Sequence, residues 1–173
     1  MVVAGRVTGV EWDGRFFAPQ RYLAMAAWLP RVILFVAQLQ GRMDSEPLPA
    51  VLLSITPSGA EPWPHLRPQE VVRLIHLVIR WNVGVFNNGC FVRSMARYHF
   101  LRRMGAPVSL RLGVESRKPA EAATPLAAGA FDHLRSHLWV VLSGQPYFER
   151  EPEKFESYRL LLSYPANAEF PGP

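Results

Sequence analysis

Cys90 is the only cysteine in the chain, and its type and position make it a candidate for chemistry. One thiol cannot form an internal disulfide or a cysteine-rich zinc site, so both uses are excluded. A turn over Asn82–Gly89 leads into a predicted helix that begins near Cys90. The free amides and dipole of a helix start stabilise a thiolate, and the same amides can stabilise an oxyanion. Cys90 is therefore a candidate nucleophile, and the alternative is a small buried apolar side chain.

A thiol nucleophile needs a base, and the chain has five histidines, His65, His76, His99, His133 and His137. His65 lies between prolines, where solvent exposure is expected. His76 lies inside an apolar helix, where a packed or edge position is expected. His99 follows Cys90 by nine residues on the same predicted helix, about 13.5 Å along its axis, which is too far to share a site. His133 and His137 remain. We favour His137 because it opens a predicted strand, Ser136–Leu142, which would hold a base rigidly against the helix start.

The third group of a triad must be a glutamate, because no aspartate follows His137 in the sequence. A three-residue hairpin loop over Leu142–Gly144 places Glu149 opposite His137 on one face of the hairpin. A two-residue turn places Arg150 there instead, and a loop that starts one residue later places Glu151 there. The glycine suits the left-handed position of the three-residue loop, so we predict Glu149. The alternative is that these glutamates belong to a solvated run of charges.

The first half of the chain predicts helices around a proline-rich connector. Pro19–Arg42 is apolar on most sides and predicts a deeply packed helix that is kinked or split at Pro30 and ends at Gly41. The connector, residues 44–68, contains six of the sixteen prolines, and Ala50–Ile55 is its one stretch that could be regular. Pro68 then opens an amphipathic helix that reaches Trp81.

The second half predicts the nucleophile helix and a sheet. The Cys90 helix ends at Met104, where Gly105 offers a left-handed cap. Strands are predicted by alternating apolar residues or by turn signals at Val108–Val114, Ser136–Leu142, Gln145–Phe148 and Phe155–Tyr164. Helices followed by an antiparallel sheet define an α+β fold. The predicted organisation is one domain over 1–173: a helical part over 1–81, a catalytic core over 82–165 and a loose tail over 166–173.

Length and composition fit a globular domain. The chain has 173 residues, 49% of them hydrophobic, and a formal charge of +5, which is modest and compatible with binding either an acidic peptide or nucleic acid. The first 19 residues carry charges and no apolar run, so no secretory signal is predicted and a cytoplasmic location is expected. Tyr22–Leu39 is the nearest approach to a membrane span, but Pro30 and Arg31 at its centre argue against stable insertion.

Several short motifs follow one another in an order that is similar to a known family. They are Gly89-Cys90-Phe91-Val92-Arg93-Ser94, Leu101-Arg102-Arg103-Met104-Gly105-Ala106-Pro107, Leu112-Gly113-Val114, Ser136-His137-Leu138-Trp139-Val140 and Gly144-Gln145-Pro146. This order resembles the transglutaminase-like cysteine protease fold, and more closely the stand-alone leader peptidases of lasso-peptide biosynthesis. The resemblance covers Asn82 to about Arg150. It differs in two respects, since the family's acid is usually an aspartate and the stretch from Val114 to His137 is longer here.

The resemblance implies a cysteine peptidase that removes the leader from a ribosomally made precursor peptide, with Cys90 as nucleophile and His137 as base. It also implies a separate small leader-recognition protein and a downstream cyclase as partners. No cofactor and no metal are expected, and nucleic-acid binding is not expected because no basic motif with interleaved aromatic residues is present. The alternatives are acyl transfer on another amide, or a catalytically idle peptide-binding module. Arg93 and Arg97 suit an acidic substrate, although helical arginines more often serve solubility or packing.

Overall fold

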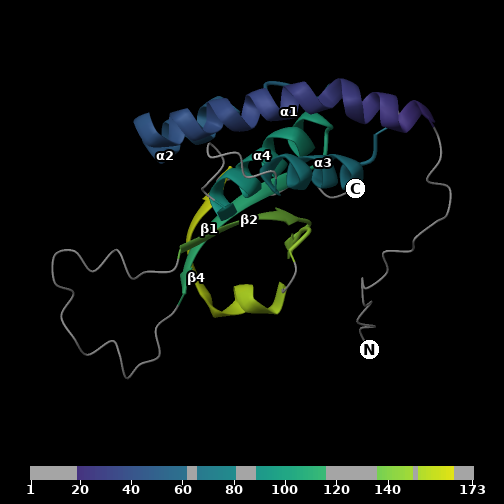
Figure 1. Ribbon diagram of the computed structural model, residues 1–173. Helices are drawn as coiled ribbons and strands as arrows, with labels where there is room; N and C mark the ends of the chain where they lie inside the picture. Colours follow the sequence, from purple (N-terminus) through teal and green to yellow (C-terminus); the bar gives the residue numbers. More distant parts are fainter. Residues whose placement is uncertain (1–18, 62–65, 81–88, 116–135, 150–151, 166–173) are drawn as a thin grey trace, which may run out of the picture.

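The computed structural model describes residues 19–61, 66–80, 89–115, 136–149 and 152–165 (Figure 1). Four helices cover one side of a four-stranded antiparallel sheet, and a short 3-10 helix lies on the other side. The α+β class expected from the sequence is therefore confirmed. Residues 82–88 of the predicted turn, residues 116–135 of the long stretch between Val114 and His137, the tail, His65, His133, Arg150 and Glu151 lie outside the described residues.

The first helix, α1, runs without a break from Pro19 to Ser45, so of the predicted kink or split at Pro30 the split is wrong, and the predicted end at Gly41 is wrong as well. A proline inside a helix removes one backbone hydrogen bond, but the packing of the following turns compensates for this loss. Val32 and Val36 are fully buried against the rest of the helical layer. The last turn continues past Gly41, whose carbonyl accepts a hydrogen bond from the Ser45 hydroxyl at 2.9 Å.

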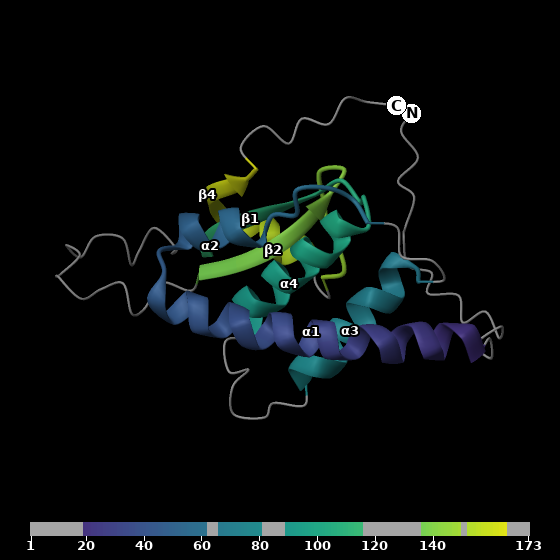
Figure 2. The same ribbon diagram turned by 90° about the horizontal axis from the view of Figure 1, so that it is seen from above.

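Within the described residues, one segment, Tyr22–Ser45, is long and apolar enough to cross a membrane by length and composition alone. Its mean hydropathy is 1.6, and 17% of the apolar window is buried inside the protein. The core helix of a soluble protein and a signal sequence meet the same criterion. In this fold α1 lies across α3 and α4 as the outer layer, so the predicted deep packing of this helix is wrong (Figure 2).

The remaining helices follow the local signals in the sequence. The connector contains α2, Leu48–Ile55, and α3 spans Pro68–Arg80. The Glu70 carboxylate accepts a hydrogen bond from the Arg67 amide at 2.7 Å and so satisfies a free donor at the start of α3. The fourth helix, α4, spans Gly89–Arg103 and ends in a Schellman motif, in which Gly105 has a φ of 86°. The predicted starts of these two helices are confirmed to within a residue.

The sheet has the strand order β3-β2-β1-β4. Its central strand β1, Val108–Glu115, pairs with β2, Ser136–Leu142, and with β4, Tyr158–Tyr164, in antiparallel register. The predicted last strand begins three residues too early, because Pro152–Ser157 forms the 3-10 helix η3. Along β2, Leu138 and Val140 join the core under the helices, whereas His137 and Trp139 face the other side, toward η3.

The hairpin between β2 and β3, Gln145–Pro146, closes with two residues, so the predicted three-residue loop is wrong. Leu142 pairs with Gln145, and both Ser143 (φ 50°) and Gly144 (φ 80°) are left-handed. Two consecutive left-handed residues are typical of the type I′ turn. The backbone twist of this two-residue turn matches the right-handed twist of the two strands that it joins. One more backbone hydrogen bond, from the Tyr147 amide to the Val140 carbonyl at 2.8 Å, follows β3, and the left-handed Phe148 (φ 57°) then ends the pairing, so register places nothing opposite His137.

Gly113 explains the Gly-Val pair at the end of β1. It pairs with His137 on β2, and the Trp139 ring crosses directly over it. A Cβ at this position would lie 2.9 Å from the Trp139 ring and 3.0 Å from the Tyr158 Cβ. Only glycine leaves room for the indole beside His137.

We expect Gly113→Ala to lower the free energy of unfolding by about 1–3 kcal/mol, because either Trp139 or β4 must move to admit the methyl group. The matched control is Gly41→Ala, since a Cβ at that position meets nothing within 4 Å. Urea unfolding followed by tryptophan fluorescence measures the free energy of unfolding of both variants. Equal stability of Gly113→Ala and the unmodified protein would show that the indole does not depend on this glycine.

Candidate active site

The start of α4 and the start of β2 lie at the same end of the core. The chain reverses at Gly105 and enters β1, which packs against α4, and β2 runs antiparallel to β1. Consequently α4 and β2 run in the same direction, side by side, as Figure 2 shows. Cys90 in the first turn of α4 is therefore at the end of the core where His137 opens β2.

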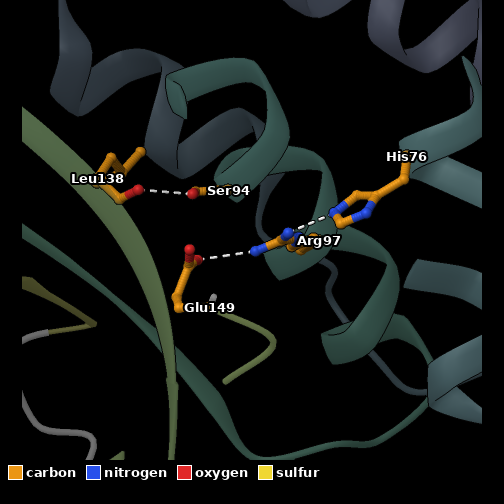
Figure 3. Close-up of polar contacts among 5 residues, drawn as sticks. All are labelled: His76, Ser94, Arg97, Leu138 and Glu149. Atoms are coloured by element: carbon orange, nitrogen blue, oxygen red, sulfur yellow. Dashed lines mark hydrogen bonds and ion pairs between the residues drawn. The ribbon is translucent and has the colours of Figure 1, made fainter. Parts of the chain in front are cut away.

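One buried hydrogen bond fixes how far α4 is shifted along β2. The hydroxyl of Ser94, which is 2% exposed, donates to the Leu138 carbonyl at 2.6 Å (Figure 3). Cys90 precedes Ser94 by four residues, so it lies on the same face of the helix, about 6 Å nearer its start. Because His137 directly precedes Leu138, this hydrogen bond sets the thiol-bearing turn near the level of His137 along β2. The His137 side chain itself faces the other side of the strand, toward η3, and within the described residues no hydrogen bond joins it to the Cys90 thiol.

Aromatic rings hold the half-buried imidazole of His137. Its centroid lies 5.4 Å from the Phe155 ring, 6.0 Å from the Tyr158 ring and 6.2 Å from the stacked Trp139 ring. In the described part of the chain, neither ring nitrogen of His137 has a hydrogen-bond partner. Burial lowers the pKa of His137 below its ordinary value, and the charges of Arg93 and Arg97 lower it further. The imidazole is therefore neutral near pH 7, as a general base must be.

Glu149 lies at this site but is paired with an arginine. Its carboxylate accepts a hydrogen bond from the Arg97 guanidinium at 2.8 Å, and the other terminal nitrogen of Arg97 contacts His76 (Figure 3). The Arg97 side chain is 3% exposed and that of Glu149 is 14% exposed. Burial raises the pKa of Glu149, and the adjacent Arg97 charge opposes that rise. Glu149 thus neutralises a buried cation and makes no hydrogen bond to His137.

A cavity of about 690 Å³ connects these groups. His137 and Glu149 line it together with Arg93 and Arg97 of α4, and α3 and η3 complete its walls. The lining residues do not include Cys90, which precedes the lining residue Arg93 by three residues on α4. Its size is that of a site for a small molecule or a short peptide segment.

The histidines other than His137 have different roles where they are described. His99 stacks on Phe35 at 4.1 Å, and its ring lies 2.6 Å from the Ile55 carbonyl, so it belongs to the contact between α4 and the other helices. His76 lines the cavity, a position that sequence reasoning missed. Its spacing from Arg73 and Arg80 on one face of α3 was the available signal, but the apolar helix suggested packing. Within the described chain, no group of three or more His, Cys, Asp or Glu could hold a metal ion.

The order of elements defines a class of protein. A cysteine in the first turn of a helix that packs beside a strand with a histidine as its second residue is the arrangement of a papain-like or transglutaminase-like core. A family model described as the transglutaminase-like superfamily matches residues 32–163. The chain therefore belongs to the transglutaminase-like superfamily, a fold that includes cysteine peptidases and acyltransferases. The search of curated proteins and the search of solved structures gave no match.

Removing the Glu149 charge tests how this residue acts. We expect Glu149→Gln to lower the free energy of unfolding by about 3 kcal/mol, because it leaves the buried Arg97 cation uncompensated. It should also lower the pKa of His137, measured by NMR titration, because the Arg97 charge is then no longer offset.

The double variant Arg97→Gln/Glu149→Gln separates two explanations. If Glu149 acts through Arg97, the His137 pKa in the double variant is at least that of the unmodified protein, and much of the lost stability returns. A His137 pKa that stays low in the double variant would mean that Glu149 acts on the imidazole directly.

Proposed function

We propose that this protein is a cysteine peptidase that uses Cys90 as nucleophile and His137 as base. The observation that carries the proposal is the alignment of α4 with β2. The hydrogen bond from Ser94 to Leu138 sets the first turn of α4 against the start of β2, within a transglutaminase-like fold. The neutral, aromatic-packed imidazole and the adjoining cavity are the further requirements that a peptidase site has.

The proposed reaction follows from these positions. His137 accepts the thiol proton, and the Cys90 sulfur attacks the carbonyl carbon of the scissile peptide bond. Amides at the start of α4 stabilise the oxyanion. His137 then donates its proton to the leaving amine, and water, deprotonated by His137, hydrolyses the thioester and regenerates the thiol. Glu149 is the proposed third residue of the site, and it supports the imidazolium by reducing the positive charge of Arg97.

The proposed substrate is a ribosomally made precursor peptide of the lasso-peptide type, from which the enzyme removes the leader. The Cys-x-x-Arg-Ser, Gly-Val and His-x-Trp-Val motifs support this choice. A separate small leader-recognition protein and a downstream cyclase are the proposed partners, and the cytoplasm is the proposed site of action.

Incubation with the precursor peptide encoded beside the gene, with and without the neighbouring small protein, tests the proposal by mass spectrometry. We expect cleavage at one bond with the unmodified protein. Cys90→Ala and His137→Ala should each reduce the rate by at least about a thousandfold while leaving the circular-dichroism spectrum unchanged. His99→Ala is a control for the loss of a histidine outside the site. Cleavage retained in either site variant would refute the mechanism.

The pH dependence has a defined sign. The base must be neutral, and the pKa of His137 is lowered by burial and by two arginines. The acidic limb of kcat/KM should therefore lie below pH 6.5, the ordinary value for histidine. Removing the positive charge with Arg93→Gln should move that limb to higher pH. A limb at or above pH 6.5 in the unmodified enzyme would contradict this assignment.

A catalytically idle or acyl-transferring protein that binds peptides is the second candidate. The observation that favours it is the pairing of Glu149 with Arg97 instead of His137. Labelling by iodoacetamide distinguishes an idle protein, because an activated Cys90 reacts rapidly near pH 7 and slows on His137→Ala. The mass of the product distinguishes acyl transfer from hydrolysis, since an incorporated amine adds its own mass.

A further inference from the structure

The cavity beside His137 is strongly basic. Five cationic side chains and one carboxylate line it, a surplus of four positive charges, against +5 for the whole chain. The cations come from both helices that flank the cavity and from η3: Arg73 and Arg80, Arg93 and Arg97, and Lys154. The concentration of charge at one place predicts an anionic ligand there.

The arginines that line the cavity differ in how exposed their side chains are to solvent and to a ligand. Arg97 is buried and its charge is met by Glu149, so it belongs to the framework. Arg80 and Arg93 have exposed side chains, and within the described residues neither forms a hydrogen bond or an ion pair. They extend from α3 and α4 into the same cavity, so one anion between the two helices can be reached by both.

The rest of the lining indicates what carries the anion. Leu77, Phe148 and Phe155 contribute apolar surface to the cavity, and Leu77 is 41% exposed. A wall that alternates apolar and cationic side chains over about 690 Å³ fits a few residues of an extended peptide. Guanidinium groups bind a carboxylate through two parallel hydrogen bonds, which a lysine cannot do.

We propose that Arg80 and Arg93 form a subsite for the carboxylate of an Asp or Glu side chain in the peptide substrate, next to the scissile bond. The proposal rests on the proposed function, and it names the substrate class of that site. A bound carboxylate also adds a negative charge to the cavity that His137 lines, where the charges of Arg93 and Arg97 otherwise lower the pKa of His137. Substrate binding then favours the imidazolium that must protonate the leaving amine.

The test measures binding in the Cys90→Ala background, so it does not require turnover. The probes are two heptapeptides with blocked ends, alanine throughout except for a central Glu in one and Gln in the other. NMR titration should give at least about tenfold tighter binding of the Glu peptide, equal to about 1.4 kcal/mol. The preference should decrease as salt is raised.

Variants of the two arginines assign the preference to the subsite. Arg80→Gln/Arg93→Gln should bind both peptides equally, and Arg42→Gln should keep the preference, because Arg42 is exposed on α1 and is not a lining residue. Equal binding of the two peptides, binding of neither, or a preference that survives in the double variant would overturn the proposal. A Glu preference in a protein that cleaves no precursor would refute the peptidase alone, and cleavage without the preference would refute the subsite alone.

Discussion

The packing of α4 along the first half of β2 is the contact on which the rest of the site depends. Apolar burial holds the helix against the sheet, but apolar contacts tolerate sliding along an axis. The hydrogen bond between the buried Ser94 hydroxyl and the Leu138 carbonyl tolerates much less sliding, because a shift of the helix would leave both groups without a partner in a low-dielectric interior. This bond sets the first turn of α4, and with it Cys90, at the level of His137.

A second buried contact lies one helical turn further along α4. Arg97 is nearly inaccessible to solvent, and a buried guanidinium is tolerated only when paired. Glu149 supplies that pair and so anchors the chain that leaves the short β3 strand against the helix. The same cation acts on His137 through space, which links the structural pair to the proton affinity of the candidate base. The Arg97 side chain therefore both pairs with Glu149 in the interior and lowers the pKa of His137.

The side chains on the two faces of β2 contact different parts of the protein. Leu138 and Val140 close the helical core, while His137 and Trp139 face η3, and His137 also lines the cavity. Gly113 makes this possible, because a larger residue in β1 would collide with the indole. The surplus of cationic side chains therefore lies in the same cavity as the His137 imidazole.

The sequence by itself determined the local structure and the class of fold. Helix signals at Pro68, Cys90 and Gly105 and the alternation in β1 and β2 depend on near neighbours, so they were predicted to within a residue or two. The end of α1 at Ser45 and the two-residue hairpin were not, because packing of the few buried residues of α1 and the twist of the strands outweighed the local glycine signals.

Only the tertiary structure decided the partner of Glu149. The sequence paired it with His137 through a hairpin register, whereas the folded chain brings it to Arg97, 52 residues away. The tertiary structure also decided which of the two cavity arginines on α4 is exposed, Arg93, and which is buried and paired with Glu149, Arg97. Spacing in a sequence gives the face of a helix, but burial and charge pairing are set by what packs against that face.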